Sequence, residues 1–274
     1  MRLLAMLFTT FGLVATSANA EEIKVFAAGS LKAAMGDLAK AFQAQNTQAT
    51  IKTEFGASGL LRERIEKGEA AHVFASADTG HPKALVDAGK TDGPPAIFAR
   101  NQLCALAKEG LAVTPDTLVG VLLDPAVRVG MSTPKADPSG DYALVLFAKA
   151  EMVQPGVKAA LEAKAVQLTG GPQSEKAPEG RNLYAWVMSS GKADVFLTYC
   201  TNALVAKDEA PSLQIVAIPA VLAVGADYGL VVLKDSPVTA TEFARFVVSA
   251  EGRRILQRWG FGPAPLTEPA VRRP

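Results

Sequence analysis

Short apolar strands alternate with amphipathic helices along most of the chain. Residues 22–27, which include the apolar run 25–27, predict a first strand, and residues 50–55 alternate between apolar and polar positions as a second strand. A third short strand is predicted over residues 73–77. After the first two strands, apolar side chains recur three or four positions apart, as on one helix face: Leu31, Ala34, Met35, Leu38 and Phe42, then Leu60, Leu61 and Ile65. This alternation predicts an α/β fold with a mostly parallel, doubly wound sheet.

The pattern continues through a second α/β unit and then returns to the first. The later strands are predicted at residues 102–108, 127–131, 193–198, 213–218 and 228–233, and the last long helix at 241–259. We expect two lobes, the first formed by residues 21–101 and 231–263 and the second by residues 102–230. The strands 102–108 and 228–233 would cross between them. Residues 264–274, which contain prolines and two arginines, predict a flexible tail.

Two serines stand where a predicted strand gives way to a helix. Ser30 lies in the sequence VFAAGSL (25–31) and Ser58 in FGASG (55–59), and both are expected to be helix N-caps. A third such turn is Asp137-Pro138-Ser139-Gly140. A serine in this position ordinarily does no more than cap its helix. Because a helix start offers free N–H groups and a positive dipole end, the coincidence of these turns favours a hypothesis in which they face one small anion.

The N-terminus predicts export. Arg2 precedes an apolar run over residues 3–14, which is too short to span a bilayer, and Ala18-Asn19-Ala20 has the form of a cleavage site. Residues 1–20 are therefore predicted to be a signal peptide, and we expect the mature protein in a periplasm. The net charge of +1, with no basic tail or run of like charges, indicates that nucleic acid is not a partner. We expect a monomer.

Cysteine and histidine are scarce. Cys104 and Cys200 form a disulfide or stay as two buried thiols, and the sequence leaves both possibilities open. Only His72 and His81 are present, with no cysteine or carboxylate at ligand spacing, so no metal site is predicted.

Nucleophilic catalysis is the competing hypothesis. Ser132 and Ser189 each precede a lysine by three positions, as in the S-x-x-K motif of penicillin-binding enzymes. That motif needs a helix to bring serine and lysine together, and Pro134 and Gly191 interrupt both segments. A secreted serine hydrolase using Ser58 or Ser132 stays a less favoured alternative.

Several of these segments together resemble the periplasmic molybdate-binding proteins of ABC importers. The matching segments run in order over about residues 23–262: 25–31, FGASGLLR at 55–62, VFASAD at 73–78, DPSG at 137–140 and VFLTY at 195–199. The resemblance implies a two-lobed periplasmic binding protein fold of type II, with the ligand in the cleft and held without cations or cofactors. By match, Ser30 and Ser58 would give hydroxyls, Ser139 and Leu183 backbone N–H groups, and Tyr199 its phenol.

Some residues depart from the family pattern. His72 stands where the family often has aspartate, and Asp141 stands where an apolar residue is expected. We expect Asp141 to face solvent in the first turn of its helix rather than to bind the ligand. The segment 199–202 is also atypical. The resemblance implies molybdate or tungstate as the ligand, delivered to a membrane permease without catalysis; the alternative ligand is sulfate or another small anion.

Overall fold

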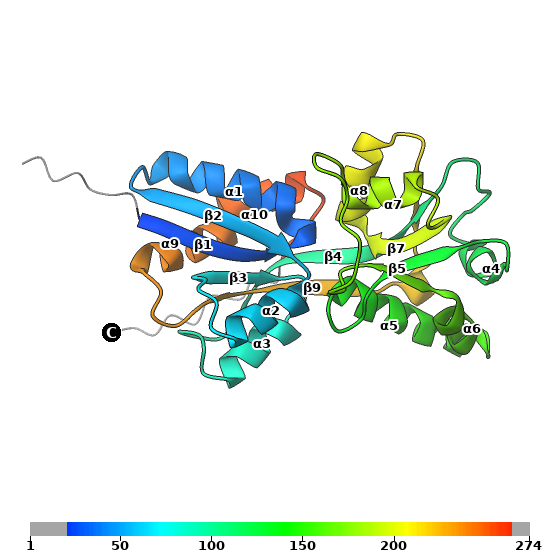
Figure 1. Ribbon diagram of the computed structural model, residues 1–274, viewed down its shortest axis with the longest axis horizontal. Helices are drawn as coiled ribbons and strands as arrows, with labels where there is room; N and C mark the ends of the chain where they lie inside the picture. The colour runs from blue at the N-terminus through cyan, green and yellow to red at the C-terminus, as the bar shows by residue number, and fades with distance from the viewer. Residues whose placement is uncertain (1–20, 265–274) are drawn as a thin grey trace, which may run out of the picture.

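Residues 21–264 are described by the computed structural model, in which helices flank a nine-stranded mixed sheet. The strands follow the order β2-β1-β3-β9-β4-β7-β5-β6, and β8 pairs with β4. Figure 1 shows two lobes side by side, joined where β4 (Ala96–Ala107) and β9 (Gly225–Val232) run between them. The predicted signal peptide, and the predicted tail apart from Ala264, lie outside the described residues.

The first lobe is built on parallel strands. β1 (Glu21–Ala28) pairs in parallel with both β2 (Ala49–Gly56) and β3 (Val73–Ser76), and β9 joins β3 antiparallel. Side chains of β1 alternate between faces, so that Val25 packs in the main core while Phe26 packs in a separate cluster. The helices of this lobe are α1 (Lys32–Gln45), α2 (Ser58–Glu66), α3 (Gly80–Asp87), α9 (Val238–Val248) and α10 (Ala250–Arg258), with a short 3-10 turn η1 (Gly29–Leu31) before α1.

The second lobe repeats this plan with a mixed sheet. β5 (Val129–Ser132) lies parallel between β6 (Val166–Thr169) and β7 (Val195–Tyr199), while β8 (Gln214–Ala217) runs antiparallel to β4. Helices flank both sides of these strands in Figure 1. They are α4 (Leu118–Leu123), α5 (Pro138–Val153), α6 (Val157–Lys164), α7 (Leu183–Ser189) and α8 (Cys200–Glu209), with a 3-10 turn η2 (Ala220–Leu222).

The two crossing strands belong to both lobes. Residues 96–102 of β4 pair with β9, and residues 103–107 pair with β7 and β8. In turn, residues 229–232 of β9 pair with β3. The lobe boundaries predicted at 101/102 and 230/231 therefore fall inside continuous strands. Two of their side chains, Asn101 of β4 and Tyr228 of β9, contact residues that follow the ends of β7 and β1, Thr201 and Ser30 respectively.

Two helix predictions need correction. The single helix predicted over 241–259 is wrong, because α9 ends at Val248 and α10 starts after an extended Ser249. The Ser249 hydroxyl accepts the N–H of Gly252, which is a capping interaction. Helix α8 was not predicted at all, since two of its buried positions are the polar residues Thr201 and Asn202.

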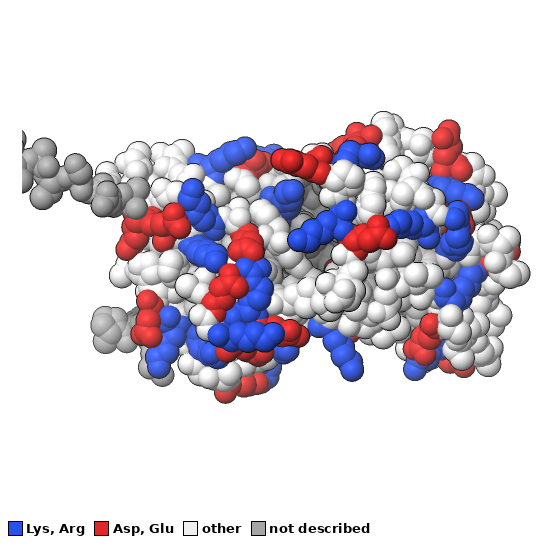
Figure 2. All heavy atoms as spheres, viewed as in Figure 1, with Lys and Arg blue, Asp and Glu red and all other residues white. Residues whose placement is uncertain are grey.

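Charges of both signs are mixed on the visible face of the molecule (Figure 2). On the face that Figure 2 shows, lysine and arginine side chains are interspersed with aspartate and glutamate. Within residues 21–264, no helix has the length and apolar character needed to cross a bilayer.

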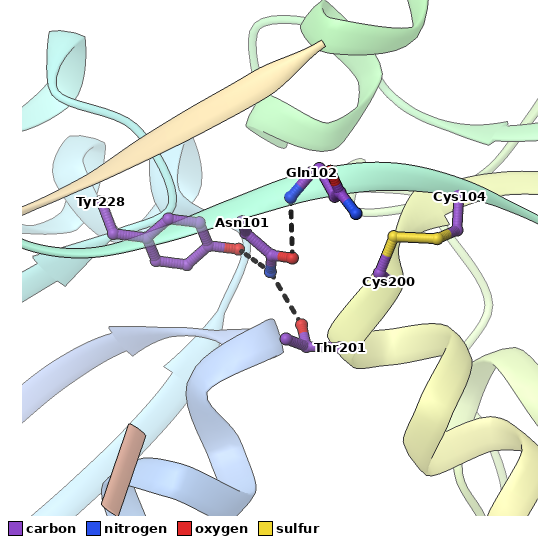
Figure 3. The surroundings of a disulfide bond; sticks show 6 residues. All are labelled: Asn101, Gln102, Cys104, Cys200, Thr201 and Tyr228. Carbon is purple, nitrogen blue, oxygen red and sulfur yellow. Dashed lines mark hydrogen bonds between the residues drawn. A yellow bond between two sulfur atoms is a disulfide. The ribbon is translucent and has the colours of Figure 1, made fainter. Parts of the chain in front are cut away.

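A disulfide joins Cys104 to Cys200, which decides between the two states that the sequence left open for these residues (Figure 3). It connects β4 to the first residue of α8, directly after Tyr199. The alternative of two free thiols is therefore wrong. The bond holds the end of β7 against a strand that both lobes share.

We expect the disulfide to contribute about 2–4 kcal/mol to the free energy of unfolding, because it closes a long loop in the unfolded chain. The double substitution Cys104→Ser and Cys200→Ser should remove this contribution in denaturant unfolding. Reductant should destabilise the unaltered protein by a similar amount and leave the double variant unchanged. Equal stability of the unaltered and double-variant proteins would contradict the expectation.

Candidate functional site

Ser58 binds the backbone that follows β3. It is the first residue of α2, and Ala57 is the N-cap, so the prediction that Ser58 caps its helix is wrong. Its hydroxyl accepts the N–H of Ala77 at 3.1 Å and is buried. Because the hydroxyl does not cap α2, it is available to bind residues outside its own helix, such as Ala77.

Tyr199 reaches the same peptide segment from the other lobe. At the end of β7, its phenol donates to the carbonyl oxygen of Ala77 at 3.1 Å. Ala77 therefore has its N–H bound to Ser58 and its C=O bound to Tyr199. Burial raises the pKa of Tyr199 well above 10, so the phenol keeps its proton and remains a donor at neutral pH.

Ser30 forms a second polar contact, with Tyr228 on the crossing strand β9. Ser30 lies inside η1, whose N-cap is Ala28, so its predicted capping role is also wrong. Its hydroxyl lies 2.9 Å from the Tyr228 hydroxyl, and either can donate. Asn101 on β4 donates to the same Tyr228 oxygen at 3.0 Å and to the Thr201 hydroxyl at 2.8 Å (Figure 3).

Tyr228 and Asn101 were not singled out from the sequence. The Asn101 amide is oriented by its own oxygen, which accepts the N–H of Gln102. Tyr228 stacks edge-on against Tyr199, with ring centroids 5.5 Å apart. Tyr142 of α5 also packs against Tyr199, with ring centroids 6.2 Å apart. The only sequence signal was the place of residue 228 at the start of a strand predicted to cross between the lobes.

Ser139 lies in the first turn of α5 and is bound to polar groups of its own lobe. The N-cap of α5 is Asp137, not Ser139, and its carboxylate accepts the Ser139 N–H at 3.0 Å. The Ser139 hydroxyl donates to Ser132 at 3.3 Å, and Ser132 in turn contacts Thr169. The backbone donor that the resemblance assigned to the ligand is therefore engaged by a carboxylate. Burial raises the pKa of the Asp137 carboxyl to about 6.

Leu183 is the first residue of α7, and Asn182 is its N-cap. The Asn182 side chain caps this helix by accepting the N–H groups of Tyr184 and Ala185. Among residues 21–264, no hydrogen bond uses the Leu183 N–H. Within the same range, no hydrogen bond joins either Leu183 or Ser139 to the other three predicted ligand residues, which are Ser30, Ser58 and Tyr199.

The two atypical residues have structural partners. Both carboxylate oxygens of Asp141 accept the N–H of Lys135, at 3.0 and 3.1 Å, so Asp141 closes a turn instead of simply facing solvent. His72 accepts the N–H of Lys24 on its Nδ1 atom at 2.9 Å. Within the described residues, no group of three or more histidine, cysteine or acidic side chains is placed to hold a metal ion.

A close backbone contact joins the lobes beside these side chains. The N–H of Gly59 donates to the carbonyl oxygen of Ala136 at 2.8 Å. A Cβ atom at position 59 would overlap the carbonyl oxygens of Lys135 and Ala136. Only glycine permits this approach. A cavity of about 440 Å³ also lies along the crossing strands, with Asn101, Tyr142 and Asp227 among its lining residues.

Comparison with known proteins assigns the family. The model of the bacterial extracellular solute-binding proteins matches residues 23–262. The chain belongs to this family. It is 39% identical over 181 residues to protein PM1146 of Pasteurella multocida, covering 66% of this chain and 74% of that protein. It is 29% identical over 253 residues to the molybdate-binding protein ModA of Mycobacterium tuberculosis, covering 89% of this chain and 85% of ModA.

Solved structures of periplasmic binding proteins share the fold. The periplasmic molybdate-binding protein of Azotobacter vinelandii superposes with a TM-score of 0.69 at 20% identity, covering 89% of this chain and all of that one. The sulfate-binding protein SubI of M. tuberculosis gives a TM-score of 0.74 at 19% identity, covering 90% and 88%. The predicted two-lobed periplasmic binding protein fold of type II is thereby confirmed. The chain is a solute-binding component of an ABC transporter, a class that delivers its solute to a membrane permease.

We expect Gly59→Ala to open the contact between the lobes, because the added methyl group overlaps two carbonyl oxygens of the second lobe. Small-angle scattering should give a larger radius of gyration for this variant than for the unaltered protein. Gly36→Ala is the matched control, since a Cβ atom there meets nothing within 4 Å. Equal radii for all three proteins would contradict the expected separation.

We expect the Asp137 carboxyl to make stability fall as pH rises from about 4 to 6. Its pKa is near 3.8 when exposed and about 6 in the fold, so the folded state binds more protons in this range. The loss amounts to about 3 kcal/mol at most, at about 1.4 kcal/mol per pKa unit. Asp137→Asn keeps a capping oxygen and should remove this dependence. The measurement is the unfolding free energy of both proteins at pH 4 and pH 7; a constant difference between them would contradict the expectation.

Proposed function

We propose that the protein binds a tetrahedral oxyanion between its lobes, with molybdate as the ligand and tungstate as a near-equal, and delivers it to the permease of its transporter. Support comes from the 29% identity to ModA over most of both chains. The proposed ligand residues are Ser30, Ser58, Ser139, Leu183 and Tyr199. We further propose that the protein acts in the periplasm as a monomer, after cleavage of residues 1–20.

The observation that carries the proposal is the meeting of Ser58 and Tyr199 at Ala77. One hydroxyl comes from the start of a helix in the first lobe and the other from the end of a strand in the second. Ser30 lies at the end of the adjacent strand β1 and contacts the crossing strand through Tyr228. These groups are neutral donors gathered from both lobes, as an oxyanion held without cations requires.

Neutral donors are sufficient on energetic grounds. A hydrogen bond to a charged acceptor contributes roughly 1.5–3 kcal/mol. Several such bonds would offset the cost of closing two lobes around a small ion, and no single bond is strong enough to prevent release. Because the ligand would bind only the closed arrangement, it should also stabilise the protein against heat.

Sulfate is the second candidate. It is a dianion of the same shape, and the sulfate-binding protein SubI shares the fold. Within residues 21–264, no hydrogen bond joins a histidine to Ser58 or Ser132, which does not favour the hydrolase alternative. Family members are solute-binding proteins, in line with the proposal that the chain catalyses no reaction.

We expect Ser30→Ala and Ser58→Ala each to weaken molybdate binding by roughly 1.5–3 kcal/mol, because each removes a donor to a charged acceptor. Isothermal titration with molybdate, tungstate and sulfate measures this loss and the preference among the anions. Ser189→Ala is the control, since that hydroxyl is exposed and bonds only within its own helix. Wild-type affinity in both variants would refute the assignment, and sulfate binding tighter than molybdate would favour the second candidate.

A further inference from the structure

Asp137 is the N-cap of α5 and lies directly beside Ser139, one of the proposed ligand residues. None of the ion pairs formed within residues 21–264 includes it. One oxygen accepts the Ser139 N–H. The other packs against Gly170, where a Cβ atom would lie 2.6 Å from it, so the carboxyl is held in place by backbone on two sides.

The titratable groups around Asp137 do not neutralise it. Asp141 from the same helix adds a further negative charge, which raises the pKa of Asp137. Burial raises the pKa of three phenols, Tyr184 from α7, Tyr199 from β7 and Tyr228 from β9, and the negative charge of Asp137 raises each pKa further. All three phenols therefore stay neutral. Ser132 and Ser139 contribute hydroxyl groups only.

A carboxylate in this place limits the negative charge with which a ligand can bind beside it. A fully deprotonated dianion beside an ionised carboxylate is repelled, and the partial burial of Asp137 weakens the screening of the two charges by water. One proton shared between them removes the repulsion and supplies a hydrogen bond. Molybdate and sulfate bring no proton at neutral pH, so the carboxyl must take one up, whereas hydrogen phosphate brings its own.

We propose that Asp137 is a specificity-determining residue of this site, which binds a tetrahedral oxyanion together with one proton held at the Asp137 carboxyl. This inference rests on the proposed anion-binding function. The Asp137 carboxylate occupies the N–H of Ser139, which the resemblance assigned to the ligand. The proposed role of Asp137 explains why a carboxylate can stand there. Once protonated, the carboxyl becomes a donor to the anion instead of a competitor for its donors.

The other ionisable groups nearby are less suited to this role. Both oxygens of Asp141 are engaged by the N–H of Lys135. His81 on α3 faces Asp78, with 3.9 Å between its Nε2 atom and the carboxylate, and burial lowers its pKa below 6.5, so it is neutral above pH 7. Asp141→Asn and His81→Gln therefore serve as matched controls.

Isothermal titration with molybdate in two buffers of different ionisation heat counts the protons taken up. For the unaltered protein at pH 8 we expect one proton per molybdate, and an affinity that falls about tenfold from pH 7 to pH 8. Asp137→Asn should take up none, bind molybdate at least tenfold more tightly at pH 8, and show no pH dependence. Phosphate should bind this variant more weakly than the unaltered protein, because the acceptor for its proton is gone.

The controls and outcomes separate this inference from the function on which it rests. Asp141→Asn and His81→Gln should keep the uptake of one proton. Asp137→Ser, which preserves a helix cap, replaces Asp137→Asn if that variant fails to fold. Molybdate binding without proton uptake, at equal affinity at pH 7 and 8, overturns the inference and leaves the proposed function standing. Binding of none of molybdate, tungstate, sulfate or phosphate overturns both.

Discussion

Polar groups buried between two lobes must find hydrogen-bond partners, and this requirement shapes the centre of the molecule. Ser58 and Tyr199 come from different lobes and bind the N–H and the carbonyl of the same residue, Ala77. The bond from Tyr199 crosses between the lobes and would be lost if they separated, unless water or a ligand replaced its partner, whereas the bond between Ser58 and Ala77 lies within the first lobe. The contact of Gly59 with Ala136 holds the lobes at the distance where these bonds form. An oxyanion offers the same donors a charged acceptor, so binding and closure favour one another.

The crossing strands and the disulfide support this centre from outside. Asn101 and Tyr228 lie on β4 and β9, which belong to both lobes, and they connect Ser30 to Thr201 through side-chain hydrogen bonds. The disulfide at Cys200 fixes the chain between Tyr199 and Thr201 to β4. In the segment 199–202, which is atypical in sequence, the proposed ligand residue Tyr199, the disulfide at Cys200 and the contact of Thr201 with Asn101 therefore follow one another.

The architecture could be predicted from the sequence because the spacing of apolar residues determines the order of strands and helices. Apolar spacing located most strands and helices, and the serines were correctly expected where strands end. The capping roles were wrong because N-cap and first helical residue differ by a single backbone torsion, which the residue types at 57 and 58 do not determine. Tyr228 and Asn101 were missed since their partners lie about 100 to 200 residues away. Asp141 was expected to face solvent, but its carboxylate accepts the N–H of Lys135, and it is Asp137 that caps the helix and binds the N–H of Ser139.

Crystals grown with tungstate and measured at the tungsten absorption edge test the central claim most directly, because tungsten can be located independently of the protein density. We expect one anomalous peak per chain, enclosed between the lobes, with its oxygens within hydrogen-bond distance of the Ser30, Ser58 and Tyr199 hydroxyls. A peak on the outer surface, or no peak in crystals soaked with excess tungstate, would contradict the claim that neutral donors from both lobes hold a tetrahedral oxyanion.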